Sequence, residues 1–368
     1  MTDFAYALEA DGLSLRLPDG GTLTFPWLWL RDSEPAAFHP VTRERRFDLL
    51  SVEADIRPTR AEMTGGAIRL HWPDLAEPRT YDLDWLQRRA PGRRRPDPAD
   101  IAPAPWAAGF RPLRFEAAAL EGDAALATML ATLKRDGLIL VEGLDGEEAG
   151  IELGRRIGFL RETNFGVIFE VISRPEPNNQ AYTADDLPLH TDLPNQQLVP
   201  GYQFLHCVDN AATGGDSVFA DGLRILEDLR SAAPDDFRLL TEIEAPYRFR
   251  DTDTDIRIRR PLVELDREGR PVRLAFNPGI LDIVDMDPEI VGDWYRAYRG
   301  MQAAVAQHPC RLELRLHAGE MAVFDNSRVL HGRTAFDPNS GKRRLRGYYI
   351  DRGEMDSRLR VLHGAQDE

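Results

Sequence analysis

Two histidines and one aspartate have the residue types and the spacing of a metal site. His190 and Asp192 are two residues apart, and His331 follows a segment that ends in apolar residues. Side chains two apart on an extended segment point to the same face. Two imidazoles and one carboxylate form the face that holds non-haem iron(II) and leaves three coordination positions open. We therefore interpret these three residues as candidate metal ligands and catalytic residues.

Two further segments belong to the same set of motifs. Ser217 begins an apolar run, and three arginines follow His331 by 12 to 15 residues: Arg343, Arg344 and Arg346. The planar fork of an arginine can pair a carboxylate through two hydrogen bonds. The alternative is a basic strand edge that only deters aggregation. Because a His-x-Asp sequence alone is weak evidence, the prediction depends on the whole set.

Composition limits the possible partners. The 368 residues are enough for about two domains, and 42% hydrophobic with 29% charged residues is typical of a soluble globular protein. The net charge of −15 disfavours a nucleic-acid-binding surface. No apolar stretch approaches the roughly 20 residues of a membrane span, and the first residues lack the pattern of a signal peptide. We expect a cytoplasmic protein with no nucleic-acid or membrane partner, whose two cysteines are buried free thiols.

The residue pattern changes along the chain and predicts its domains. Residues 1–88 alternate with period two around turns such as 18–21, which is typical of a small β-rich N-terminal domain. Residues 89–111 are rich in Pro and Arg, and we interpret them as a linker. Residues 112–368 then form the domain that carries the candidate site.

The larger domain mixes helical and strand patterns. Helical periodicity covers 117–136, 147–158 and 285–307, and apolar strand segments recur at 137–141, 201–208, 217–220, 272–276, 321–324 and 345–350. This pattern indicates a mainly β fold with flanking helices. We expect a double-stranded β-helix, a jelly roll that holds small ligands in its mouth.

The set of motifs resembles the iron(II)- and 2-oxoglutarate-dependent dioxygenases of the taurine-dioxygenase-like superfamily. Three further segments are similar to the γ-butyrobetaine and trimethyllysine dioxygenases: 29–32 (Trp-Leu-Arg-Asp), 179–183 (Asn-Gln-Ala-Tyr-Thr) and 347–362. The resemblance covers nearly the whole chain. It implies an enzyme that hydroxylates a small substrate and forms succinate and carbon dioxide from 2-oxoglutarate and dioxygen.

The resemblance assigns roles around the metal. The two histidines and the aspartate would bind Fe(II), with 2-oxoglutarate and O2 as cosubstrates. Arg343 and Ser217 match positions that bind 2-oxoglutarate. Arg346 is the weaker candidate, because a residue three further along a strand faces the opposite way. The presence of Asp192 favours hydroxylation over halogenation, because related halogenases carry a small residue in place of this carboxylate.

The resemblance also implies a substrate with a quaternary ammonium group, held by aromatic rings through cation–π attraction. Four positions match the rings: Phe165, Phe169, Tyr182 and Tyr349. Phe165 and Phe169, four apart, could equally be core residues. Asn179 and Asn277 match positions that bind a substrate carboxylate. Because the residues after Asn277 differ from the relatives, hydroxylation of 2-(trimethylamino)ethylphosphonate is the alternative to a γ-butyrobetaine-like substrate.

The N-terminal domain departs from the relatives, in which a cysteine cluster after the Trp-Leu-Arg-Asp sequence binds structural zinc. This chain has no cysteine before Cys207, and His39 and His71 alone make a poor closed zinc site. We predict no zinc, and expect the domain to be held by packing of its large apolar side chains: Trp27, Trp29, Trp72 and Trp85.

A different class of function fits part of the pattern. A non-catalytic, cupin-like metal-binding module would explain a barrel and the histidines, but it would leave Ser217 and Arg343 without a role. The resemblance also implies a homodimer, for which the residues themselves give no signal.

Overall fold

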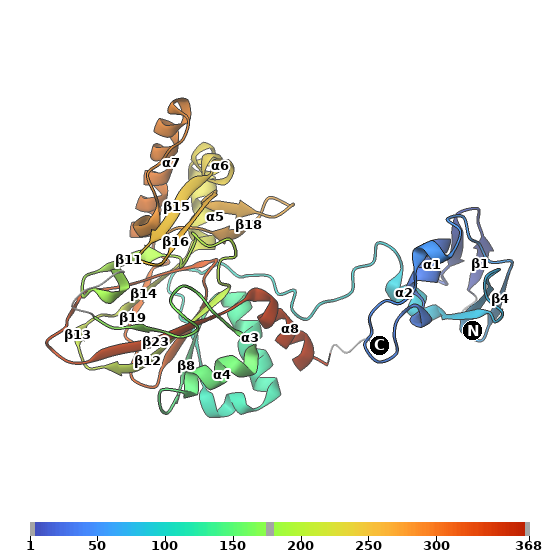
Figure 1. The fold of residues 1–368 in the computed structure, drawn as a ribbon, viewed down its shortest axis with the longest axis horizontal. Helices are drawn as coiled ribbons and strands as arrows, with labels where there is room; N and C mark the ends of the chain where they lie inside the picture. The colour runs from blue at the N-terminus through green and yellow to red at the C-terminus, as the bar shows by residue number, and fades with distance from the viewer. Residues whose placement is uncertain (1–3, 174–179, 365–368) are drawn as a thin grey trace. The chain divides into compact units, whose positions relative to one another are not determined.

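The computed structural model describes residues 4–173 and 180–364 (Figure 1). The chain divides into two compact units, Met1–Asp97 and Pro98–Glu368. Among the described residues, no helix is both long enough and apolar enough to cross a membrane.

The smaller unit consists of two antiparallel three-stranded sheets and two short helices. The sheets are β1 (Ala5–Leu8), β2 (Gly12–Arg16) and β3 (Thr22–Pro26), and β4 (Arg60–Thr64), β5 (Ala67–His71) and β6 (Arg79–Asp82). The helices are α1 (Trp27–Ser33) and α2 (Leu83–Arg89). The strand pair expected around the turn at 18–21 is present as β2 and β3, and β5 pairs with β6 in the same way.

A buried ion cluster adds to the apolar packing of this unit. The Arg31 guanidinium is 3% exposed, donates to Glu34 at 2.5 Å and to Asp74 at 2.6 Å, and lies 5.4 Å from the Trp72 ring centre. Burial raises the pKa of Glu34 despite these positive charges. The Arg side chain of the Trp-Leu-Arg-Asp segment therefore joins distant parts of the unit.

The larger unit contains two sheets. One has the strand order β10 (Phe169–Val171), β23 (Arg343–Ile350), β12 (Tyr202–Asn210), β20 (Met321–Asp325), β8 (Leu138–Glu142) and β7 (Leu113–Glu116), and β9 (Leu160–Arg161) also pairs with β23. The other has the order β11 (Leu187–His190), β21 (Val329–Arg333), β14 (Ser217–Asp221) and β19 (Leu312–Leu314). All neighbours are antiparallel except β7 and β8.

Alternation along the strands divides the core between two faces of the larger sheet. Ile139 and Val323 pack with the helices α3 (Asp123–Asp136), α4 (Ala149–Ile157) and α8 (Arg352–Leu362). Leu140 and Phe324 point the other way and share a core with β14 and β21 of the second sheet. That second core also contains α5 (Gly222–Ala232), α6 (Pro234–Glu242) and α7 (Pro288–Gln307) (Figure 1).

Short two-stranded pairs complete the unit. Two are hairpins, β15 (Ala245–Arg250) with β16 (Asp255–Arg260) and β17 (Val263–Leu265) with β18 (Pro271–Leu274), whereas β13 (Thr213–Gly214) pairs with the distant β22 (Phe336–Asp337). Helices and strands have similar extents in the whole chain, so the fold is mixed α and β rather than mainly β.

The segment 98–111 packs onto the larger unit, which corrects the linker expected at 89–111. Ala99 and Trp106 are each 2% exposed. The Trp106 ring stacks on Phe110 with 4.2 Å between centroids, and its indole Nε1 donates to the Asp136 carbonyl at 2.6 Å. A composition rich in Pro and Arg concealed this single large apolar anchor.

A buried ion pair ties this segment to the sheets. The Arg328 guanidinium donates to both Asp221 carboxylate oxygens, at 2.9 and 2.8 Å, and both side chains are almost fully buried. The same carboxylate accepts from the backbone N–H groups of Trp106 and Leu223 at 2.8 and 3.0 Å, and Arg328 also donates to the Ala104 carbonyl at 2.6 Å. One carboxylate thus joins the 104–106 segment, α5 and the turn before β21.

We expect Asp221→Ala to lower the free energy of unfolding by about 3–5 kcal/mol, because it leaves a buried guanidinium without its counter-charge. Denaturant unfolding of the full chain measures this. The control is Glu242→Ala, which removes the exposed partner of Arg238 and should change the free energy by less than about 1 kcal/mol. Equal effects of the two variants would contradict a structural role for the buried pair.

Candidate active site

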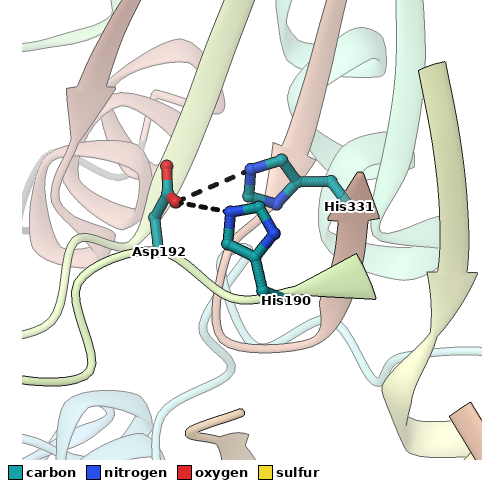
Figure 2. A group of neighbouring side chains, drawn as sticks. All are labelled: His190, Asp192 and His331. Carbon is teal, nitrogen blue, oxygen red and sulfur yellow. Dashed lines mark hydrogen bonds and ion pairs between the residues drawn. The ribbon is translucent and has the colours of Figure 1, made fainter. Parts of the chain in front are cut away.

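The three metal-ligand candidates meet in the larger unit. Their potential ligand atoms all lie within 4.8 Å of one another. The Nε2 atoms of His190 and His331 lie 3.1 and 3.7 Å from Oδ1 of Asp192. Figure 2 shows both rings turned toward this carboxylate. Among the described residues this is the only such group of three.

Strand pairing and one loop position these side chains. β11 and β21 are antiparallel with His190 directly opposite His331, and the two rings are 4.3 Å apart. Asp192 follows the end of β11, where Asn326 holds its backbone: the Asp192 N–H donates to Asn326 Oδ1 at 2.7 Å, and Asn326 Nδ2 donates to the Asp192 carbonyl at 3.0 Å. The chain turns at Leu193, which has a positive φ of 56°.

Electrostatics keep the carboxylate ionised. Burial would raise the pKa of Asp192, but the two imidazoles and a hydrogen bond from Tyr349 hold that pKa well below its ordinary value. The Tyr349 hydroxyl donates to Asp192 Oδ2 at 2.7 Å, and burial followed by the Asp192 charge raises the pKa of this tyrosine. Oδ1 is left facing the histidines.

The donor set fits a divalent transition metal. Burial, and then the neighbouring His190, lowers the pKa of His331 to about 3, so that His331 is neutral, the form that binds metals. Burial opposes protonation of His190 as well, but Asp192 outweighs it and raises the pKa. His190 Nδ1 donates to the Pro188 carbonyl at 2.8 Å. That bond orients the ring and leaves Nε2 for a metal.

The site opens into a cavity of about 550 Å³. Alternation along β23 decides which of its side chains reach the cavity. Arg343, Leu345 and Tyr349 line it, whereas Arg344 and Arg346 do not.

Arg343 is a buried cation beside the metal-ligand group. It is 9% exposed, donates to the Gly215 carbonyl at 3.0 Å and lies 5.3 Å from the Phe336 ring centre. It makes no ion pair with any described residue. Burial, and then the like charge of Arg333, lowers its pKa to about 10, so that it remains a cation at neutral pH. Ser217, 6% exposed, lines the same cavity.

The other two arginines are paired on the opposite face of β23. Arg344 bonds to Glu147 and Glu170, and Arg346 donates to Glu148 at 2.7 Å. The structure therefore does not bring Arg346 to the site. The sequence argument that strand alternation turns it away agrees with its position.

The four predicted aromatic residues all line the cavity: Phe165, Phe169, Tyr182 and Tyr349. Phe169 and Tyr349 lie 5.2 Å apart, and Phe169 occupies the space above Gly347, where a Cβ would come within 2.3 Å of its ring. We call these four cavity-lining rings the aromatic wall; they come from the segment between β9 and β10, from β10, from β23 and from the segment after residue 179.

Two asparagines, Asn179 and Asn277, were predicted to bind the anionic end of the substrate. Asn277 lines the cavity, but its side chain is engaged locally: Nδ2 donates to the Thr191 carbonyl at 3.2 Å, and Oδ1 accepts from the Gly279 N–H at 3.1 Å. Asn179 lies outside the described residues.

Sequence reasoning missed several cavity residues, among them Phe249, Asn195 and Gln203. Phe249 of β15 lies 5.3 Å from Phe165 and extends the aromatic wall. Asn195 and Gln203 line the cavity with side-chain atoms that are buried and make no hydrogen bond to the described residues. Gln203 lies opposite Tyr349 in the sheet, a register that the sequence pattern does not reveal.

Two family models match the chain. The model described as taurine catabolism dioxygenase TauD, TfdA family matches residues 100–349. The chain belongs to this dioxygenase family. A second model, described as gamma-butyrobetaine hydroxylase-like, N-terminal, matches residues 6–87. The protein is therefore an enzyme of the iron(II)- and 2-oxoglutarate-dependent class, and the alternative of a non-catalytic module is set aside.

Individual relatives support the family assignment. The chain is 39% identical to gamma-butyrobetaine dioxygenase of Pseudomonas sp. (strain AK-1), over 96% of this chain and 94% of that protein. It is 29% identical to gamma-butyrobetaine dioxygenase of Homo sapiens, over 92% and 91%. A solved structure of asparagine oxygenase with Fe(II), 3-hydroxyasparagine and succinate shares the fold, with a TM-score of 0.51 and 18% identity over 62% of this chain and 80% of that one.

Arg343 faces the cavity and Arg344 faces away from it, so their removal should affect the KM for 2-oxoglutarate differently. Arg343→Ala should raise the KM for 2-oxoglutarate by roughly 10-fold or more, because a charged hydrogen-bond partner is worth about 1.5–3 kcal/mol. Arg344→Ala is the matched control and should leave that KM nearly unchanged. Succinate formation at varied 2-oxoglutarate gives both values. A larger effect from Arg344→Ala would reverse the assignment.

Proposed function

We propose that this enzyme hydroxylates a small trimethylammonium compound, γ-butyrobetaine-like in size, while 2-oxoglutarate is converted to succinate and carbon dioxide. The observation that carries the proposal is an aromatic wall in the same cavity as a metal-ligand group and a buried arginine that makes no ion pair with the described residues. Kinship with gamma-butyrobetaine dioxygenases supports it.

We assign the metal to His190, Asp192 and His331. Bound there, iron(II) would supply open coordination positions for the 2-oxo acid and dioxygen. The residues of this chain do the remaining work around it. Tyr349 fixes the carboxylate through its 2.7 Å hydrogen bond, and the buried surroundings keep His331 neutral.

We assign the far carboxylate of 2-oxoglutarate to Arg343, with Ser217 as a hydroxyl partner. Within the described part of the chain, the buried Arg343 guanidinium donates to the Gly215 carbonyl alone, so it retains donors for an anion. Burial strengthens such a pair, because water no longer screens the charges.

We assign the ammonium group to the wall of Phe165, Phe169, Tyr182 and Tyr349. A trimethylammonium group has no N–H, so dispersion and ring quadrupoles are the forces available to hold it. Tyr349 would then serve both the substrate and the Asp192 carboxylate. Phe249 extends the same wall.

The anionic end of the substrate has several candidate partners. Asn277 lies in the cavity but already makes two hydrogen bonds, whereas Asn195 and Gln203 are buried with polar atoms unused by the described residues. Buried polar atoms without partners are costly, which supports a polar ligand group or water beside them. Asn179 stays a prediction. Neutral amides suit a carboxylate or a phosphonate, so 2-(trimethylamino)ethylphosphonate is the alternative substrate.

We also propose that the two sheets of the larger unit form the jelly roll expected from the sequence. Their shared core of β14, β21, β20 and β12 residues supports this. The small N-terminal domain without zinc, the homodimer and the cytoplasmic location stay predictions.

Succinate release by the iron-loaded enzyme tests the proposal. We expect γ-butyrobetaine to stimulate succinate release well above the level without substrate, with trimethyllysine and 2-(trimethylamino)ethylphosphonate as comparison substrates. Stimulation by the phosphonate alone would assign the anionic end to that group. If none of the three stimulates while iron and 2-oxoglutarate still bind, the trimethylammonium assignment fails and the dioxygenase class stands.

A further inference from the structure

Arg333, two residues after His331 on β21, is a buried arginine whose partners are backbone carbonyls. It is 5% exposed, and it donates from Nη1 to Ala181 at 3.3 Å and from Nη2 to Thr183 and Asp185 at 2.9 and 2.8 Å. It makes no ion pair with the described residues. A guanidinium held by three carbonyls of one short segment acts as a clamp on that segment.

The clamped segment carries Tyr182, a residue of the aromatic wall. Further bonds join the same two stretches of chain: the Phe336 N–H donates to the Ala184 carbonyl at 3.1 Å, and the Ala335 N–H donates to Asp186 at 2.5 Å. Leu187 then begins β11 opposite Arg333 and leads to the metal-ligand histidine. One arginine thus joins the metal strand to the backbone on both sides of Tyr182.

The location of the guanidinium makes it unlike an ordinary surface arginine. It lines the cavity and lies 4.9 Å from the centre of the Phe336 ring, which also contacts Arg343. Burial lowers the pKa of Arg333 despite the nearby Asp185. Burying a cation here costs free energy. This cost suggests two roles for Arg333: its carbonyl bonds position the segment, or its charge attracts an anion.

We propose that Arg333 is a positioning residue that fixes Tyr182 relative to the metal-binding histidines, and so sets where the substrate lies. This inference depends on the proposed function only for the identity of the substrate. Lysine cannot replace arginine in this role, because a single ammonium group lacks the planar fork that reaches several fixed carbonyls. The competing role is electrostatic, in which the charge of Arg333 attracts 2-oxoglutarate together with Arg343.

Two variants separate these roles. Arg333→Lys keeps the charge and loses the fork, whereas Arg333→Met keeps only an apolar stem. If Arg333 positions Tyr182, both variants should raise the KM for the trimethylammonium substrate by roughly 10-fold, the size of one lost charged hydrogen bond. Both should also release more succinate per hydroxylated product, while the KM for 2-oxoglutarate stays within about twofold.

A readout that needs no turnover accompanies the kinetics. Hydrogen–deuterium exchange of peptides covering residues 180–189 should become faster in both variants, with iron(II) binding retained. Arg156→Lys is the matched control, because Arg156 also donates to two backbone carbonyls, those of Leu120 and Glu121, and does not line the cavity. It should leave exchange in 180–189, coupling and both KM values unchanged.

Two outcomes would overturn the proposal. One is unchanged exchange and coupling in both variants. The other is a raised KM for 2-oxoglutarate in Arg333→Met but not in Arg333→Lys, which would assign Arg333 the electrostatic role. If no trimethylammonium compound is a substrate of the wild type, the exchange measurement still tests the clamp, so the two failures are distinguishable. If Arg333→Met does not fold, the Arg333→Lys variant alone decides through exchange and coupling.

Discussion

The antiparallel pairing of β11 with β21 is the constraint on which the rest of the site depends. It sets His190 opposite His331 and leaves two imidazoles 4.3 Å apart in a buried place. Two cations there would repel each other, so the environment keeps His331 neutral and brings in one carboxylate, Asp192. The bonds from Asn326 and Tyr349 hold that carboxylate in place. Metal affinity follows from groups that are already oriented, with His331 neutral and Asp192 ionised.

The alternation of side chains along β23 and β21 determines which residues of these strands face the cavity. On β23 the residues that face the cavity provide a cation and an aromatic ring, and those between them provide surface ion pairs. On β21 the same alternation puts Arg333 on the side of His331, where it holds the segment that carries Tyr182. The positions of His190, His331, Arg343 and Tyr349 therefore depend on the strand register within the two sheets. A one-residue slip would turn these side chains to the opposite face.

Local pattern explains what the sequence could predict. His190 with Asp192, and Arg343 as distinct from Arg346, depend on period two within one segment, which is visible without tertiary structure. Phe249 could not be found, because its hairpin reaches the cavity only through long-range packing against Phe165. The hydrogen bond from Tyr349 to Asp192 is likewise a tertiary contact.

Composition was the less reliable guide. Residues 98–111 look like a linker because Pro and Arg dominate them, yet Trp106 anchors the segment in the core. The helix expected from 117 begins as α-helix only at Asp123, after a 3-10 turn over Ala117–Glu121. Such boundaries depend on packing and capping more than on periodicity.

An anaerobic titration of iron(II) into the protein, with and without 2-oxoglutarate, tests the central claim most directly. The visible absorption of a 2-oxo acid chelated to iron(II) should appear only when both are present and saturate at one iron per chain. It should be lost in His331→Ala. The account would be contradicted if His331→Ala gave the same absorption at the same iron concentration, because the metal would then lie elsewhere.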